Sequence, residues 1–259
     1  MGINMVNDIK NEKITEENNL YKLFREEPLE MIRIIRISAE EGIDIDSSER
    51  EAIIREVHNI RNVEMEELRD EFEKILLSNP RKIDDLIGCG ILEYIIPELN
   101  KCVGVNQQNP YHCFDVYNHI ISTVCNIDEE RELRFAMLLH DIAKPQCKTV
   151  DAKGIGHFYG HGEVSTKKAR EILKRLKYDD ETIERVALLI KYHDRQIANT
   201  KKSVRKLLKL VGEEGFLDLL KVKRADVLGQ SPELAEQRLE ELEAIKGTLK
   251  EVIEQEKEK

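Results

Sequence analysis

Apolar residues in the first hundred positions recur at the three- and four-residue spacing of an amphipathic α-helix. Residues 20–39 form one such helix, and Gly42 follows as its stop signal. Within Ser47–Glu51, a Ser-x-x-Glu capping box opens the next helix. The same spacing predicts two further helices, over residues 64–77 and 83–87.

The rest of the chain keeps the helical spacing, with one exception. Thr149–Tyr159 has the turn residues and the composition of a strand-turn-strand segment. The predicted helices cover residues 114–125, 129–143, 163–176, 180–193, 203–210, 215–227 and 232–256. The predicted fold class is therefore all-α with a small β-hairpin.

Shifts in composition divide the chain into four parts. Residues 1–18 are polar and predict a flexible leader, and residues 19–100 form an N-terminal helical region. An Asn-, Gln- and Gly-rich stretch opens a second helical domain over residues 101–230. Residues 231–259 are strongly charged and predict a C-terminal helix that frays at its end.

Composition narrows the functional class. The 259 residues carry a net charge of −10, are 36% charged and contain no tryptophan, as expected of a soluble helical protein. No stretch is long and apolar enough for a membrane span, and the N-terminus lacks a signal peptide. Five cysteines without a Cys-x-x-Cys pair indicate reduced thiols and a cytoplasmic location. The acidic total argues against strong nonspecific binding to nucleic acid.

The most informative stretch is the helix that runs into His140 and Asp141. An apolar run over residues 135–139 precedes this pair, and we expect Pro145 to stop the helix just beyond it. A buried histidine and carboxylate are costly unless something compensates them, and a metal ion takes both as ligands. The alternative is a helix end with a capping histidine and a solvated aspartate.

Further candidate ligands lie on other predicted helices. They are His119, His161, His193 and Asp226. Each alone is explained by a core position, a helix cap or an ion pair. Together they fit a buried cation to which several helices each contribute one nitrogen or oxygen. Imidazole and carboxylate ligands favour manganese, iron, cobalt, nickel or zinc, with magnesium also possible.

These residues resemble a known motif. His119, His140-Asp141 and Asp226 are similar to the motif of the HD superfamily of metal-dependent phosphohydrolases. His161 and His193 stand where members with two metals place their additional ligands. A closer resemblance is to the HD-containing form of bacterial CCA-adding tRNA nucleotidyltransferases. It rests on a neck-like segment at residues 24–36, body-like segments at 67–72 and 90–94, and the turn at 157–161.

The chain also departs from that family. The family's nucleotidyltransferase head would precede the neck, where only residues 1–19 stand, and its tRNA-binding tail would follow Lys259. The neck pattern Glu-Asp-x-x-Arg reads the incoming base in the family. Here Glu27 and Glu30 occupy the Asp and Arg positions, and a glutamate cannot donate the hydrogen bonds of an arginine. We therefore expect no nucleotide addition by this chain alone.

The resemblance implies hydrolysis of a phosphomonoester or cyclic phosphodiester on a nucleotide or RNA-end phosphate. Asp141 is the expected bridge between two ions, since its carboxylate offers two oxygens. Lys144 lies one turn further on and is a candidate contact for the substrate phosphate, the alternative being a solvated lysine. The alternatives to a second ion are a helix-capping role for His161 and a solvent-exposed His193.

Three more residues complete the predicted site. His112 and His157 are candidates for the substrate entrance, with surface or packing roles as the alternative, and Asp194 is a candidate for orienting an imidazole. A second functional class also stays open. The chain could be a noncatalytic partner that binds tRNA or nucleotide beside a separate nucleotidyltransferase head. The substrate, the metal and the oligomeric state do not follow from the sequence.

Overall fold

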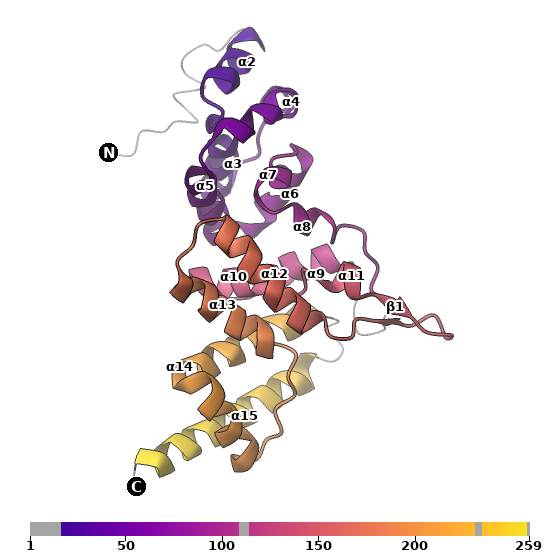
Figure 1. Cartoon of the computed structure of the whole chain (residues 1–259), viewed down its shortest axis with the longest axis vertical. Coiled ribbons are helices and arrows are strands. Elements are labelled where there is room, and N and C mark those ends of the chain that lie inside the picture. Colours follow the sequence, from indigo (N-terminus) through magenta and orange to yellow (C-terminus); the bar gives the residue numbers. More distant parts are fainter. Residues whose placement is uncertain (1–16, 109–113, 231–234, 258–259) are drawn as a thin grey trace. The chain divides into compact units, whose positions relative to one another are not determined.

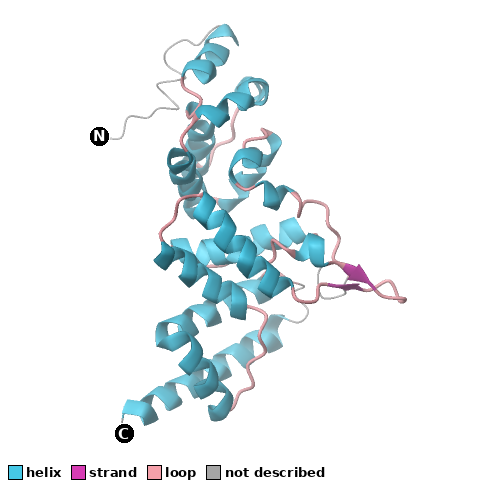
Figure 2. Ribbon diagram, viewed as in Figure 1, coloured by secondary structure: helices cyan, strands magenta, loops and turns pink. Residues whose placement is uncertain are grey.

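A computed structural model of the chain describes residues 17–108, 114–230 and 235–257. The chain divides between Asn100 and Lys101 into two compact units. Both are built of helices, and the described residues include one short pair of strands (Figure 1, Figure 2). The prediction of an all-α fold with a small hairpin is confirmed.

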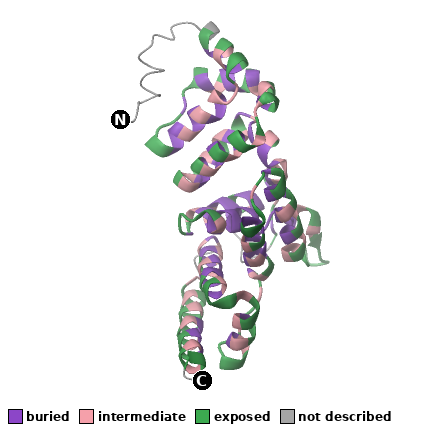
Figure 3. Cartoon of the chain, turned by 60° about the vertical axis from the view of Figure 1, so that its left-hand side comes forward, coloured by how far each residue is buried: buried purple, intermediate pink, exposed green. Residues whose placement is uncertain are grey.

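The first unit packs short helices around an apolar core. Phe24, Met31, Ile35 and Phe72 are fully buried there, because the apolar faces of their helices point inward (Figure 3). The helices are α2 (Glu17–Glu26), α3 (Glu30–Glu41), α4 (Ser47–Glu56), α5 (Met65–Ser78), α6 (Ile83–Gly88), α7 (Leu92–Ile95) and α8 (Pro97–Asn100), with 3₁₀ turns η1 (Val57–Asn62) and η2 (Pro80–Lys82).

Two details of the first unit correct the sequence predictions. The helix predicted over residues 20–39 is broken, because α2 ends at Glu26 and Pro28 precedes the start of α3. The capping box belongs to Asp46 rather than to a serine. The Asp46 side chain accepts from Glu49 N at 2.8 Å, and the Glu49 carboxylate accepts from Asp46 N at 2.8 Å.

The second unit places α10 among four neighbours. Helix α10 (Arg131–Leu139) packs against α9 (Val116–Cys125), α12 (His161–Arg175), α13 (Asp180–Tyr192) and α14 (Lys201–Leu228). Residues 133–139 are all buried, Arg134 among them, so this part of the helix is enclosed on every side and forms the centre of the unit. Helix α15 (Ala235–Lys257) packs along α14.

A small hairpin leads into α12. Strand β1 (Thr149–Val150) pairs antiparallel with β2 (Gly156–His157), with Thr149 opposite His157. Gly156 is required there, since a Cβ atom would lie 2.2 Å from the backbone oxygen of Gln107. This close approach allows a hydrogen bond between the two segments, in which Gly156 N donates to Gln108 O at 2.9 Å.

Helix ends in the second unit differ from prediction in informative ways. Helix α10 ends at Leu139, before the His-Asp pair, and Pro145 lies in the first turn of a separate short helix, α11 (Lys144–Cys147). The prediction that Pro145 stops the first helix is therefore wrong. The two helices predicted at 203–210 and 215–227 are confirmed, because α14 consists of two helices joined at Gly212, whose non-helical φ of 72° suits glycine. Within the described ranges, no helix combines the length and hydropathy that crossing a membrane requires.

Candidate metal centre

Five helices of the second unit bring the predicted ligands together. Four of the side chains sit at or just beyond helix ends, where the backbone turns the ring or carboxylate inward. His119 lies on α9, His140 and Asp141 directly follow α10, His161 begins α12, His193 follows α13, and Asp226 lies near the end of α14.

Asp141 lies at the middle of this group, with its side chain 2% exposed. Its Oδ2 atom is 3.3 Å from His119 Nε2 and 3.2 Å from His140 Nε2. Its Oδ1 atom is 3.3 Å from His161 Nε2 and 3.9 Å from His193 Nε2. In the described part of the chain, neither Asp141 oxygen has a hydrogen-bond partner in good geometry. Each oxygen of Asp141 therefore faces its own pair of imidazoles.

The outer nitrogen of every imidazole in the group is occupied by a backbone carbonyl. The pairs are His119 Nδ1 with Gly229 O (3.0 Å), His140 Nδ1 with Met137 O (2.7 Å), His161 Nδ1 with Phe158 O (2.9 Å) and His193 Nδ1 with Ile190 O (2.7 Å). A carbonyl only accepts, so each Nδ1 carries the hydrogen. In a neutral ring, Nε2 then presents a lone pair to the centre, as a metal ligand does.

The inner nitrogens approach each other closely. His119 Nε2 and His140 Nε2 are 3.3 Å apart, and the Nε2 atoms of His161 and His193 are 3.2 Å apart. Two lone pairs at this separation repel, so each pair is stable only with a proton or a cation between the rings. The residues present therefore fit a cation site on each side of Asp141.

Asp226 completes the first side. Its Oδ1 atom lies 3.1 Å from His119 Nε2 and 3.8 Å from His140 Nε2. Its Oδ2 atom accepts a hydrogen bond from Gln230 Nε2 at 3.1 Å, and Gln230 Oε1 accepts from Arg238 of α15. Because a guanidinium only donates, Arg238 fixes which end of the Gln230 amide faces Asp226.

Lys144 is part of the same buried group. Its Nζ atom is 2.7 Å from Asp141 Oδ2, donates to Gln107 Oε1 at 2.8 Å and lies 5.3 Å from the centroid of the Phe158 ring. The side chain is only 7% exposed, so the alternative of a solvated lysine is wrong. Its ammonium balances the Asp141 carboxylate in this geometry, and a contact with substrate phosphate stays a prediction.

The electrostatics favour ionised carboxylates. Burial opposes ionisation of Asp141, but His140 and Lys144 outweigh it and hold its pKa well below the usual range. For Asp226, burial is likewise outweighed by His119, and its pKa is lowered. Burial lowers the pKa of His119, yet Asp141 and Asp226 raise it overall to about 9. Burial, and then His140, lower the pKa of His193 to about 3, so this ring is neutral at pH 7.

The donor set matches a divalent transition metal. Two overlapping groups have ligand atoms within 4.8 Å of one another: His119, His140 and Asp141 on one side, and Asp141, His161 and His193 on the other. Imidazole nitrogen with carboxylate oxygen suits manganese, iron, cobalt, nickel and zinc better than an all-oxygen ion such as magnesium. Asp141 belongs to both groups, which is the arrangement expected of a bridging carboxylate.

The simpler explanations of two histidines are wrong. Helix α12 is capped by Gly160 without a side-chain hydrogen bond, so His161 is not its cap. His193 is buried, with a side chain 4% exposed, and does not end its helix in solvent. The prediction for Asp194 also needs correction. Backbone carbonyls orient the imidazoles, whereas Asp194 is exposed and lines a neighbouring cavity.

The predicted entrance histidines lie outside this group. His157 stacks on Tyr159 and its Nε2 lies 3.0 Å from Asp151 Oδ2 in the hairpin. Its role at a substrate entrance stays a prediction. His112 falls outside the described residues.

Four contributors to the centre escaped the sequence analysis. They are Gln107, Lys223, Gly229 and Gln230. Only Gln230 had a usable signal, since it follows Asp226 by four residues and so shares its helix face. Gln107 reaches the centre from a loop, and Gly229 acts through its carbonyl. Lys223 stands in the basic run of residues 221–224, which fits either a solvated face or local attraction of an anionic substrate.

Comparison with known proteins agrees with this geometry. Residues 111–230 match the HD domain family, and residues 42–102 match the family described as the probable RNA- and SrmB-binding site of polymerase A. The chain is 30% identical to the CC-adding tRNA nucleotidyltransferase of Thermus thermophilus over 226 residues, which cover 82% of this chain and 50% of that protein.

Two other relatives give the same picture. The A-adding tRNA nucleotidyltransferase of Deinococcus radiodurans is 28% identical over 70% of this chain and 44% of its own length. A multifunctional CCA protein of Neisseria meningitidis is 29% identical over 66% of this chain and 42% of its own length. The chain thus spans about half the length of these curated relatives. Its residues 111–230 match an HD domain, its residues 42–102 match a probable RNA-binding region, and both stretches are similar to parts of CCA-adding tRNA nucleotidyltransferases.

Proposed function

We propose that the chain is a metal-dependent phosphohydrolase that acts on a phosphomonoester or cyclic phosphodiester of a nucleotide or an RNA end. The observation that carries the proposal is the pairing of Nε2 atoms about the two oxygens of Asp141, with every Nδ1 already bonded to a carbonyl. Packing of a structural core does not require four imidazoles that each carry the hydrogen on Nδ1 and turn Nε2 toward one carboxylate.

The ligands divide between two ions in this proposal. His119, His140, Asp226 and Asp141 would hold one, and His161, His193 and Asp141 would hold the other. Bound ions of this kind lower the pKa of a coordinated water and withdraw charge from phosphoryl oxygens. The chain supplies the rest: carbonyls fix the ring orientations, Gln230 aims Asp226, and Lys144 offsets the charge of Asp141.

A metal and substrate screen tests this function. Chain stripped with chelator should hydrolyse p-nitrophenyl phosphate, nucleoside monophosphates or 2′,3′-cyclic nucleotides only after addition of Mn²⁺, Co²⁺, Ni²⁺, Zn²⁺ or Mg²⁺. Asp141→Asn serves as the inactive control, and Asp180→Asn as the matched control with an exposed aspartate outside the centre. Hydrolysis that survives in Asp141→Asn reflects a contaminant. Absence of hydrolysis with every metal contradicts the proposal.

A noncatalytic function is the second candidate, and the match at residues 42–102 favours it. In this version the chain binds tRNA or nucleotide, either alone or with a separate nucleotidyltransferase head. In the neck-like segment, the Glu30 carboxylate accepts a hydrogen bond from Arg33 Nη1 at 2.5 Å, and a carboxylate cannot donate a hydrogen bond to a base. Tight tRNA binding without any phosphatase activity, or co-purification with a nucleotidyltransferase, distinguishes this candidate from the first.

We also propose a cytoplasmic location. Within the described residues, Cys89, Cys102, Cys125 and Cys147 form no disulfide with one another, and the first two are buried. Free thiols persist in a reducing compartment. Fractionation of the native cells with a thiol-labelling assay tests this location.

A further inference from the structure

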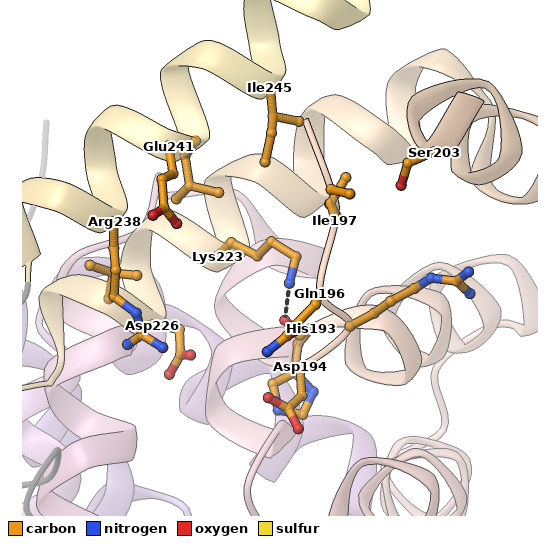
Figure 4. Close-up of a pocket in the computed structure, with 14 residues that line it drawn as sticks. His193, Asp194, Gln196, Ile197, Ser203, Lys223, Asp226, Arg238, Glu241 and Ile245 are labelled. Atoms are coloured by element: carbon orange, nitrogen blue, oxygen red, sulfur yellow. Dashed lines mark hydrogen bonds between the residues drawn. The ribbon is translucent and has the colours of Figure 1, made fainter. Parts of the chain in front are cut away.

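A cavity of about 690 Å³ opens beside the metal centre. It lies within the second unit, between the segment after α13, the C-terminal half of α14 and the first turns of α15 (Figure 4). His193 and Asp226 form part of its lining, so the cavity and the centre share two residues. A phosphate placed at the metal ligands would therefore have the remainder of its molecule in this cavity.

The walls of the cavity are of two kinds. Apolar side chains contribute one surface, and hydrogen-bonding side chains surround it (Figure 4). The apolar set is Ile197, Val227, Leu242 and Ile245, and the polar set includes Asp194, Gln196, Ser203 and Glu241. A purely apolar ligand would leave the polar groups unpaired, whereas a bare phosphate would leave the apolar surface in water. The lining suits a ligand with a flat apolar face and polar edges.

Lys223 adds a positive charge at the boundary between the cavity and the centre. Its Nζ atom donates to the backbone oxygen of His193 at 2.6 Å (Figure 4). In the described ranges, no carboxylate lies within 4.0 Å of this ammonium, while its neighbour Lys221 pairs with Asp128 and Glu130. An ammonium without a counter-ion, next to two candidate metal ligands, favours an anionic group on the ligand.

We propose that this cavity binds a nucleoside phosphate, with the base and ribose against the α15 wall and the phosphate between Lys223 and the metal ligands. The inference rests on the proposed function and adds its substrate site. A cavity of this size holds a single nucleotide, either free or as the terminal residue of an RNA. Ile197 and Leu242 then set the preference for nucleosides over other phosphoesters.

Paired substrates and paired variants test the site. Ile197→Glu places a carboxylate in the apolar wall, and Leu217→Glu makes the same change at an exposed position of α14 outside the cavity. We expect Ile197→Glu to lower the ratio of kcat/KM for AMP over p-nitrophenyl phosphate at least about tenfold, as loss of one buried apolar contact predicts. Leu217→Glu should leave that ratio unchanged. Comparing 3′-AMP with an oligoribonucleotide that ends in a 3′-phosphate identifies the source of the nucleotide.

Lys223→Gln, with Lys221→Gln as its control on the same helix, tests the phosphate contact. Lys223→Gln should raise KM for both substrates, and Lys221→Gln for neither. Calorimetric titration with AMP and Mn²⁺ gives a readout that does not depend on turnover. AMP binding that Ile197→Glu weakens supports the site even in a chain without hydrolytic activity, which would overturn only the proposed function. Unchanged AMP affinity and an unchanged substrate ratio in Ile197→Glu overturn the site itself.

Discussion

His161 Nε2 lies 3.2 Å from His193 Nε2, although the Nδ1 atom of each ring donates to a backbone carbonyl. Both inner nitrogens therefore present lone pairs to the same space, beside Asp141 Oδ1. His119 Nε2 and His140 Nε2 approach each other to 3.3 Å beside Oδ2, and in the metal-free chain the proton of His119 lies in this space. A single ion can relieve only one of these pairs, so the geometry favours two.

We predict a stoichiometry of two metal ions per chain. Elemental analysis after loading with Mn²⁺ or Co²⁺ should give two equivalents for the native chain and about one for His161→Ala, which retains the His119 side of the centre. His157→Ala is the control, since that histidine lies in the hairpin and pairs with Asp151. A native stoichiometry of one that His161→Ala leaves unchanged would rule out the second ion.

We predict that Asp141→Asn loses both ions and all hydrolytic activity. The amide keeps the shape of the side chain, but it removes the charge that faces both pairs of imidazoles. It also leaves the buried Lys144 ammonium without its carboxylate at 2.7 Å, so the variant should be less stable by about 3–5 kcal/mol. Circular dichroism and urea unfolding separate this loss from unfolding. Asp194→Asn should match the native chain in metal content and stability.

The sequence was sufficient to predict the helical fold and to select residues that the structure brings together. Each of His119, His140 and His193 follows or interrupts an apolar run, and such placement is costly without compensation. Their exact convergence did not follow from periodicity. It depends on where helices end, as with α10, which stops at Leu139 and lets the next two side chains turn inward.

The supporting contacts could not be predicted, because they come from backbone atoms and distant loops. The carbonyl of Gly229 orients His119 across 110 residues of sequence, and Gln107 contacts Lys144 across 37 residues. A single sequence contains no periodic signal for such pairs. For Lys223, the basic run of residues 221–224 fits either a solvated face or attraction of an anionic substrate, and only the fold shows that this lysine lines the cavity.

Metal affinity should rise with pH. In the metal-free chain the pKa of His119 is raised from 6.5 to about 9, so this ring is protonated at pH 7 and must release its proton to bind a metal. The apparent dissociation constant should therefore fall about tenfold per pH unit below pH 9 and level off above it. Against the effect of burial, Asp141 also raises the pKa of His161, so this ring adds a further proton release, whereas carboxylates with lowered pKa and the neutral His193 add none. Calorimetry in buffers of different ionisation enthalpy measures the released protons, and a pH-independent affinity between pH 6.5 and 8.5 contradicts the assignment.

Gln230 should act through Asp226. Its amide hydrogen bond at 3.1 Å holds Asp226 Oδ2 and leaves Oδ1 facing His119. Gln230→Leu removes that bond at nearly constant volume, and we expect metal affinity to fall about 10- to 100-fold. Gln237→Leu is the control at an exposed position of α15, where the glutamine side chain donates to Glu241. Equal affinities in the two variants would show that Asp226 needs no such support.

The last prediction concerns Gly229, whose carbonyl holds the His119 ring. A Cβ atom at this position would lie 2.5 Å from Thr123 Cγ2 and 3.4 Å from His119 Nδ1. Thr123 cannot rotate away without cost, because its buried hydroxyl donates to Ile120 O at 2.7 Å.

Gly229→Ala should therefore destabilise the chain by about 1–3 kcal/mol through overpacking, and it should weaken metal binding by displacing His119. The matched substitution Gly247→Ala on α15 meets no atom within 4 Å. There alanine should stabilise the helix by up to about 1 kcal/mol, since it has the higher helix propensity. Thermal unfolding of both variants, with and without Mn²⁺, gives the comparison. If Gly229→Ala unfolds no earlier than Gly247→Ala and binds Mn²⁺ as tightly, the close packing at this helix end does not position His119.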